Sequence, residues 1–201
     1  VTRNLFHENI TEDLFVEVNH GPFVVDNNVF LSPTTLLDWS EGGAYAHNLM
    51  AGRIVPRPEL RRLTPFHKPH STEVAGLKNI VGGDDRFYNN IFVGANGLSP
   101  YDEASLPVGM EGNVFVKGAN PSKHERNPLV QLEFDPALEL VEKADGLHLA
   151  LTFDETWTTQ RTRPLVTSEL LGKAAIPNLS YEQPDGKPIR VNADYFGKPR
   201  N

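Results

Sequence analysis

A short pattern of polar and apolar positions recurs five times along the chain: an Asn, then an aliphatic residue, then Phe or Met. The five Asn residues are Asn4, Asn28, Asn48, Asn90 and Asn113, so successive copies lie 24, 20, 42 and 23 residues apart. Periods in the low twenties are typical of stacked repeats built from short strands and bends. The interval of 42 residues predicts either two repeats or one repeat with an insertion.

In such a stack, the aliphatic and aromatic residues of each repeat are expected to point inward, onto their equivalents above and below. The Asn is expected at a bend, where it tolerates the left-handed conformation and can bond the neighbouring backbone. Short apolar runs at 23–25 and 91–93 are typical of buried parallel strands. Residues 1–118 are therefore predicted to form an all-β solenoid, with an antiparallel β-sandwich as the alternative.

The second half of the chain has a different pattern. Apolar and polar residues alternate over 130–134 and 147–153, which predicts half-buried strands, and turn signals stand at 145–146 and 185–186. Residues 119–201 are therefore predicted to form an antiparallel β appendage and an extended C-terminal tail lying on the repeats. A short helix is expected within 165–173.

Charge and composition exclude several classes of function. The chain has 19 Lys and Arg against 26 Asp and Glu, a net charge of −7, which argues against nucleic-acid binding. No apolar run is long enough to cross a bilayer, so no membrane partner is expected. The absence of cysteine excludes disulfides and a Cys nucleophile and leaves the compartment undecided.

Two carboxylates in residues 36–86 are candidates for catalysis. Asp38 follows two leucines at the end of a predicted buried strand, where a carboxylate is costly unless it is bonded, paired or functional. Trp39 beside it offers a flat face for a sugar ring. If Glu73 occupies the equivalent position one repeat on, the two carboxyls stack about 4.8 Å apart, near the ~5–5.5 Å of a retaining glycosidase. The alternatives are a strand-end cap for Asp38 and a solvated charge for Glu73.

Further polar residues in this stretch are candidates for substrate binding. His67 and His70 can hydrogen-bond a substrate or, with Glu73, bind Zn²⁺, although Pro65 and Pro69 disfavour the helical turn that this spacing needs. Asp84 and Asp85 follow two glycines and are typical of a turn, but they can also bind Ca²⁺ or orient Arg86. The basic segment between these motifs, with Arg53, Arg57, Arg61, Arg62 and Lys68, is expected to be a solvated loop or one folding over a cleft.

A resemblance to a known family makes these expectations specific. The segments 37–43, 67–74 and 82–90, together with the closing 194–201, resemble bacterial right-handed parallel β-helix proteins, and among them glycoside hydrolases of family 120, the β-xylosidases. The resemblance implies a right-handed parallel β-helix and retaining hydrolysis of a β-linked sugar. No cofactor is expected, with Ca²⁺ as the possible exception. The resemblance also implies Asp38 as nucleophile and Glu73 as acid/base, with Glu41 and Glu59 as alternatives for the second role. The residues assigned to substrate binding are Trp39, Glu41, His67, His70, Asp84, Asp85 and Arg86.

The sequence leaves other functions and partners open. A polysaccharide lyase on the same scaffold would use Ca²⁺ and an Arg or Lys base, and a non-catalytic carbohydrate-binding module would keep Trp39 without needing the carboxylates. The expected partner is a carbohydrate. Because the first repeat begins at residue 4, leaving no room for a cap, the missing repeats are expected from an upstream part of the same enzyme or from another chain, and a homo-oligomer is also compatible with this.

Overall fold

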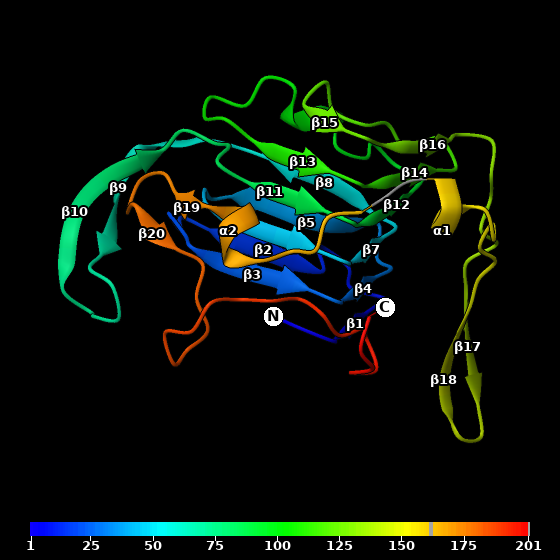
Figure 1. The fold of residues 1–201 in the computed structure, drawn as a ribbon. Coiled ribbons are helices and arrows are strands. Elements are labelled where there is room, and N and C mark those ends of the chain that lie inside the picture. Colours follow the sequence, from blue (N-terminus) through cyan, green and yellow to red (C-terminus); the bar gives the residue numbers. More distant parts are fainter. Residues whose placement is uncertain (161–162, 201) are drawn as a thin grey trace.

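The computed structural model describes residues 1–160 and 163–200, and most of its strands belong to three parallel sheets (Figure 1). Sheet A contains β3 (Phe23–Asp26), β6 (Gly43–Ala46), β11 (Arg86–Tyr88), β13 (Gly109–Glu111) and β15 (Glu125–Arg126). Sheet B contains β1 (Leu5–Phe6), β4 (Val29–Phe30), β7 (Leu49–Met50), β12 (Ile91–Val93), β14 (Val114–Val116) and β16 (Leu129–Gln131). Sheet C contains β2 (Leu14–Glu17), β5 (Thr34–Trp39) and β8 (Arg53–Pro56).

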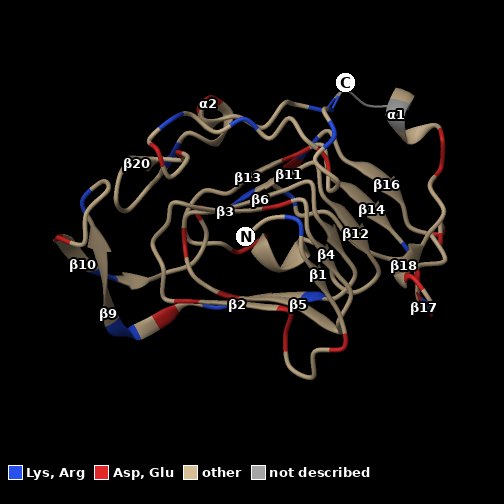
Figure 2. Cartoon of the chain, turned by 90° about the horizontal axis from the view of Figure 1, so that it is seen from below, with Lys and Arg blue, Asp and Glu red and all other residues tan. Residues whose placement is uncertain are grey.

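The three sheets enclose a common interior, which Figure 2 shows from the end that carries the N-terminus. From β2 to β8 the chain visits sheets C, A and B in turn, and after β10 it alternates between sheets A and B. The interior holds the largest buried cluster, with a short 3₁₀ helix (Ser99–Tyr101) contributing Tyr101. The members of that cluster are Val25, Phe30, Leu36, Tyr45, Met50, Ile54, Phe87, Phe92, Leu98, Tyr101, Met110, Phe115 and Ala119.

A ladder of Asn side chains holds the repeats in register. The Oδ1 atom of Asn90 accepts from the backbone N–H and the side-chain amide of Asn48, both at 3.0 Å. Asn113 does the same for Asn90 at 2.9 and 3.0 Å, and Asn48 donates to the carbonyl of Val25 in the adjacent repeat. The predicted bond from the Asn to the backbone of a neighbouring repeat is confirmed for Asn28, Asn48, Asn90 and Asn113. The left-handed conformation falls one residue earlier, as at His47 with φ 56°.

The aromatic and aliphatic residues of the repeat point in opposite directions, so the prediction that both point inward is wrong. Phe30 and Phe92 belong to the interior cluster, and stacked rings such as Phe92–Phe115 lie 5.1 Å apart. The aliphatic residues, such as Leu49 and Val114, belong to a separate cluster on the outer face of sheet B. Adjacent residues in a strand face opposite sides of the sheet, so each repeat contributes residues to both clusters.

The long interval in the repeat is one repeat with an insertion. β7 pairs directly with β12, with Leu49 opposite Ile91. The inserted residues include β9 (Glu59–His67) and β10 (Val74–Ile80), which pair antiparallel with each other and form a curved projection. We call residues 59–80 the arm.

The C-terminal part packs on two sides of the sheets. β17 (Glu139–Lys143) and β18 (Gly146–Ala150) form an antiparallel hairpin beside sheet B, next to α1 (Trp157–Gln160). α2 (Ser168–Leu171) falls inside the predicted helical segment, and β19 (Lys173–Ala174) pairs with β20 (Leu179–Ser180). The tail, residues 165–200, lies on the outer face of sheet A as predicted: Val166, Leu171, Tyr181, Ile189 and Val191 pack against Ala44, Ala46 and Tyr88.

The predicted fold class, a right-handed parallel β-helix solenoid followed by an antiparallel appendage, is wrong as stated. Over residues 1–160 and 163–200 the structure is all-β, with three parallel sheets of mostly short strands and three two-stranded antiparallel pairs. One of these pairs, the arm, interrupts the first half, and β15 and β16 extend the parallel sheets beyond residue 118. The boundary between 118 and 119 as a domain division stays a prediction. None of the helices described is long and apolar enough to span a membrane.

Candidate functional site

Asp38 lies near the end of β5, as predicted, with its carboxylate turned into the interior. One carboxylate oxygen accepts from the backbone N–H and hydroxyl of Ser40 at 3.1 and 2.5 Å, and the other accepts from the hydroxyl of Tyr101 at 2.6 Å. Only 2% of Asp38 is exposed. Burial raises the pKa of Asp38, and the hydrogen bonds from Ser40 and Tyr101 oppose that rise. The Asp38 carboxylate therefore links β5 of sheet C to Tyr101 in the interior, and it is not exposed to solvent.

Asp85 is a second carboxyl in the same interior. Its Oδ1 accepts from the backbone N–H of Gly43 at 3.0 Å, whereas its Oδ2 and the hydroxyl of Tyr45 have no hydrogen-bond partner among the described residues. Burial and then the charge of Asp38 raise the pKa of Asp85 well above its usual range. These effects favour a neutral carboxyl at this position.

Glu41 closes the turn between sheets C and A. It is fully buried, and it bonds Nδ1 of His20 at 2.8 Å while accepting from the backbone N–H groups of Val81 and Gly82 at 2.6 and 3.2 Å. All these partners are protein groups at the base of the arm. Glu41 therefore holds the chain at the point where it returns to the sheets after the arm, which is a structural task.

Asp84 and Arg86 tie the tail to sheet A. Arg86 donates to the carbonyls of Leu171 and Lys173 at 3.0 and 2.7 Å, and Asp84 bonds both Arg86 at 2.7 Å and the backbone N–H of Ala175 at 2.6 Å. Of the alternatives for this pair, the orientation of Arg86 by Asp84 is confirmed. We call Asp38, Glu41, Asp84 and Asp85 the acidic cluster.

The face of Trp39 is covered by protein. The guanidinium of Arg57 lies over its ring at 4.6 Å from the centroid, and Phe15 packs edge-on at 5.2 Å. Arg57 therefore occupies a position over the ring at which a sugar would stack. The role of Trp39 in substrate binding stays a prediction.

Glu73 stands at the tip of the arm, away from Asp38. The side chain is 63% exposed and forms an ion pair with Lys68, whereas the register partners of Asp38 are Val16 on β2 and Pro56 on β8. The predicted stacking of Asp38 on Glu73 is therefore wrong, because the insertion that carries Glu73 pairs with itself. Catalytic roles for the two residues stay predictions.

The other arm residues are also placed apart from the acidic cluster. His67 is exposed, and Nε2 of His70 bonds Glu182 of the tail at 2.9 Å. Glu59, an alternative acid/base, is largely buried and accepts from the backbone N–H of Arg61 at 2.9 Å. Within residues 1–160 and 163–200, no group of three or more His, Asp or Glu is arranged to hold a metal ion, so neither the Zn²⁺ nor the Ca²⁺ alternative gains a site here.

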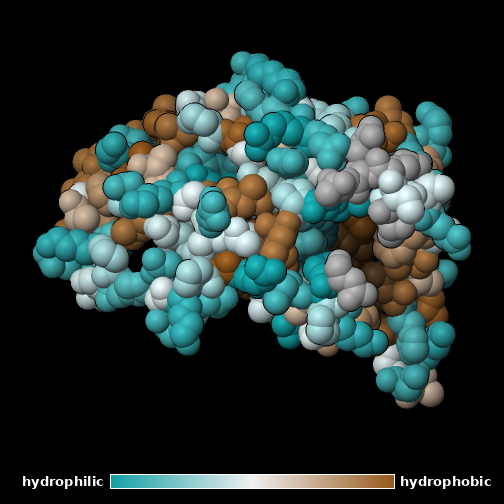
Figure 3. All heavy atoms as spheres, viewed as in Figure 1, coloured by the Kyte–Doolittle hydropathy of each residue, from teal (hydrophilic) through white to brown (hydrophobic). Residues whose placement is uncertain are grey.

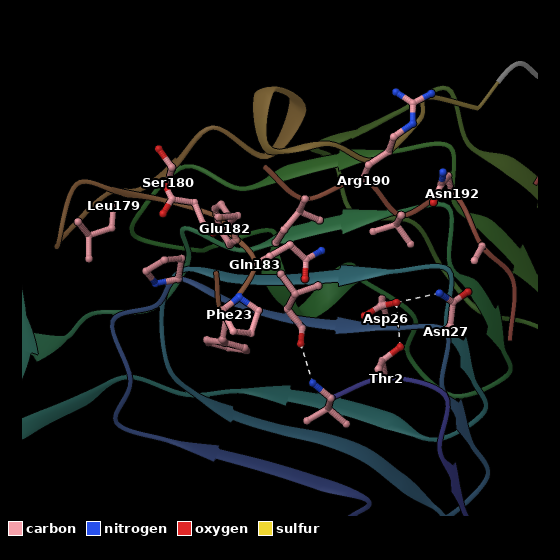
Figure 4. Close-up of a pocket in the computed structure, with 18 of the residues that line it drawn as sticks. Thr2, Phe23, Asp26, Asn27, Leu179, Ser180, Glu182, Gln183, Arg190 and Asn192 are labelled. Carbon is pink, nitrogen blue, oxygen red and sulfur yellow. Dashed lines mark hydrogen bonds between the residues drawn. The ribbon is translucent and has the colours of Figure 1, made fainter. Parts of the chain in front are cut away.

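A cleft with a volume of about 710 Å³ lies between the N-terminal edge of the sheets and the tail. Figure 4 shows Phe23 and Asp26 of β3 on one side and Gln183, Arg190 and Asn192 of the tail on the other. Apolar side chains, including Val24, Leu179, Ile189 and Val191, alternate with polar ones along its walls. We call this the tail cleft.

Of the predicted site residues, only His70 lines the tail cleft. Asp26 and Gln183 are 157 positions apart in the sequence, and neither lies in a motif. Asp26 ends a strand and Gln183 precedes the turn at 185–186, which are ordinary positions for polar residues. No signal in the sequence brings them together; the cleft exists because the tail folds back over the edge of sheet A.

Comparison with known proteins gives one informative match. No protein-family model and no curated protein matches the chain. A solved structure described as the complex of XylC with xylose matches over 100% of this chain, with a TM-score of 0.89 and 34% sequence identity. The chain spans 36% of the length of that protein.

Proposed function

We propose that this chain is part of a xylose-related glycoside hydrolase. The observation that carries the proposal is the match to XylC, whose structure was solved with xylose: 34% identity and a TM-score of 0.89 over the whole chain. Because the chain corresponds to 36% of XylC, the proposal concerns one part of a larger activity. The all-β scaffold alone would not support it, since one fold can host many functions.

The tail cleft is the place in this chain that best suits a xylo-oligosaccharide. Its volume of about 710 Å³ lies within the ~300–1,000 Å³ of small-molecule sites. The ring of Phe23 offers apolar surface, while the amides of Gln183 and Asn192 can donate to and accept from hydroxyl groups. A pentose presents the same mixture of C–H faces and hydroxyls.

We propose, more specifically, that the hydrolysis retains the configuration of the sugar. This mechanism requires two carboxyl groups at a defined separation. A retaining enzyme holds its two carboxyls about 5–5.5 Å apart, whereas here Asp38 is enclosed by Ser40 and Tyr101 and Glu73 is exposed at the arm tip. The two can act as a pair only if the arm closes toward sheet C and Asp38 is uncovered. Hydrolysis by this pair is therefore tested separately from sugar binding.

Sugar binding is tested by titrating xylobiose into the protein and following amide shifts by NMR. We expect shifts at the tail cleft and at least tenfold weaker binding for Gln183→Ala, because the wall loses an amide that bonds hydroxyls. Asn120→Ala, an exposed amide outside the cleft, serves as the matched control. Shifts elsewhere, or equal affinity in the Gln183 variant, would refute the cleft as the sugar site.

Hydrolysis is tested with an aryl β-xyloside on the complete protein. Asp38→Ala and Glu73→Gln are each expected to abolish turnover if they form the catalytic pair. Because Glu73 is exposed, Glu73→Gln leaves the fold intact and gives the cleaner result. Near wild-type turnover in that variant would reject Glu73 as the acid/base, and unsaturated products that absorb in the ultraviolet would indicate a lyase instead.

A further inference from the structure

His20 is a buried histidine at the base of the arm that the proposed hydrolysis does not use. It lies between β2 and β3 and is 2% exposed. Its Nδ1 lies 2.8 Å from Oε2 of Glu41, and its Nε2 lies 3.2 Å from the carbonyl oxygen of Lys78 on β10. The ring also contacts that of Phe66 on β9, at an angle of 82° and with 5.9 Å between the centroids. His20 therefore contacts both strands of the arm.

Both ring nitrogens of His20 face hydrogen-bond acceptors. A carbonyl oxygen can only accept, so Nε2 carries a proton. A second proton must lie between Nδ1 and Oε2 of Glu41, because without it two lone pairs would face each other at 2.8 Å in a buried place. The other oxygen of Glu41 accepts from the backbone N–H groups of Val81 and Gly82, and hydrogen bonds to a carboxylate favour its charged form. The second proton is therefore assigned to His20.

The resulting pair of charges has the partners that a buried ion pair needs. Removing two charges from water is costly, and their attraction offsets this cost only when the remaining donors and acceptors are also bonded. Glu41, which is 0% exposed, accepts three hydrogen bonds, and both N–H groups of the imidazolium donate. All of these contacts are internal to the described chain, so they do not depend on what covers its outer surface.

The base of the arm determines where its far end lies. The arm leaves the sheets at one end of the molecule (Figures 1 and 3), and Pro69 and His70, in the turn between its strands, line the tail cleft. Nε2 of His70 bonds Glu182 of the tail at 2.9 Å. A two-stranded hairpin is at best marginally stable by itself, so the direction of the arm depends on the contacts at its base. A change in that direction moves the cleft wall.

We propose that His20 is a positioning residue for the tail cleft. It is held as an imidazolium between the carboxylate of Glu41 and the carbonyl of Lys78, and this buried pair fixes the direction of the arm. The arm in turn places Pro69 and His70 at the wall of the cleft. The effect on sugar binding rests on the proposed function, whereas the protons of His20 and its hold on the arm do not.

Nitrogen-15 NMR of the histidine-labelled protein near neutral pH counts the ring protons. His20 is expected to carry one proton on each ring nitrogen. In Glu41→Gln the new amide can donate to Nδ1 while its oxygen still accepts from Val81 and Gly82, so His20 is expected to keep a single proton, on Nε2. A single ring proton on His20 in the unaltered protein would overturn the proposal, because the second proton would then belong to Glu41.

Hydrogen exchange of the arm amides, measured without sugar, tests the hold on the arm. His20→Ala is expected to speed exchange within 60–79 by about tenfold or more and to shift the ring signals of His70. His124→Ala, at an exposed site outside the arm and the tail cleft, is the matched control and is expected to change neither. Glu41→Gln keeps the hydrogen bonds and loses the charge, so its arm is expected to exchange more slowly than that of His20→Ala.

Exchange in His20→Ala equal to that of the control would contradict the positioning role. Circular dichroism establishes that each variant is folded, and His20→Gln, which keeps one donor, is compared in the same way if His20→Ala is not. Xylobiose binding is expected to weaken about fivefold or more in the variant with the released arm, since a wall of the cleft has moved. Unchanged affinity there would overturn the link to the cleft. Absence of xylobiose binding in the unaltered protein would instead reject the proposed sugar site and leave the proton count and the exchange result standing.

Discussion

The Asn ladder makes a strong prediction about stability: Asn90→Ala should destabilise the protein far more than the loss of an equivalent side chain at the ladder's end. Asn90 is fully buried, and its side chain takes part in four hydrogen bonds. Its Oδ1 accepts twice from Asn48, while its amide donates to the carbonyl of Tyr45 and to Oδ1 of Asn113. Alanine can replace none of them.

The magnitude follows from the groups left behind. The backbone N–H and the amide of Asn48, and the carbonyl of Tyr45, each lose a bond in a buried setting. At about 1–3 kcal/mol for each unsatisfied group, the loss is roughly 3 kcal/mol or more. Since single domains are stable by about 5–15 kcal/mol, this is a large share of the total.

Equilibrium unfolding in guanidinium chloride measures the effect. Asn90→Ala is expected to lower the midpoint strongly without changing the slope. Asn4→Ala, at the exposed end of the ladder, and Asn120→Ala, outside it, are expected to change the free energy of unfolding by about 1 kcal/mol or less. A loss at Asn90 no greater than that at Asn4 would refute the view that the ladder holds the sheets together.

Two further predictions concern the tail and the end of the ladder. Arg86→Ala removes the donor to the carbonyls of Leu171 and Lys173, so limited proteolysis should cut the tail sooner; unchanged cleavage would contradict its role as an anchor. Burial raises the pKa of Glu125 from 4.5 to about 7. The folded protein therefore holds this proton where the unfolded chain has lost it, and stability should fall as pH rises from about 4.5 to about 7. Glu125→Gln should remove that part of the pH dependence in denaturant titrations, and an unaltered profile would argue against it.

The sequence by itself determined the stacking of the repeats. The spacing of Asn28, Asn48 and Asn90 predicted parallel strands with an Asn bonding its neighbour, because that geometry depends only on equivalent positions lying one above another. It also predicted the turn at 185–186, the short helix and a tail lying on the sheets. These features follow from local residue chemistry.

Only the tertiary structure decided which polar residues meet. Asp38 and Glu73 looked like stacked neighbours, but the period of the repeat says nothing about how an insertion pairs, and β9 and β10 pair with each other. The aliphatic residues of the repeat face outward because the hairpin and α1 cover sheet B there. The tail cleft joins Asp26 to Gln183 through the path of the tail, and such a long-range contact depends on packing that no local pattern encodes.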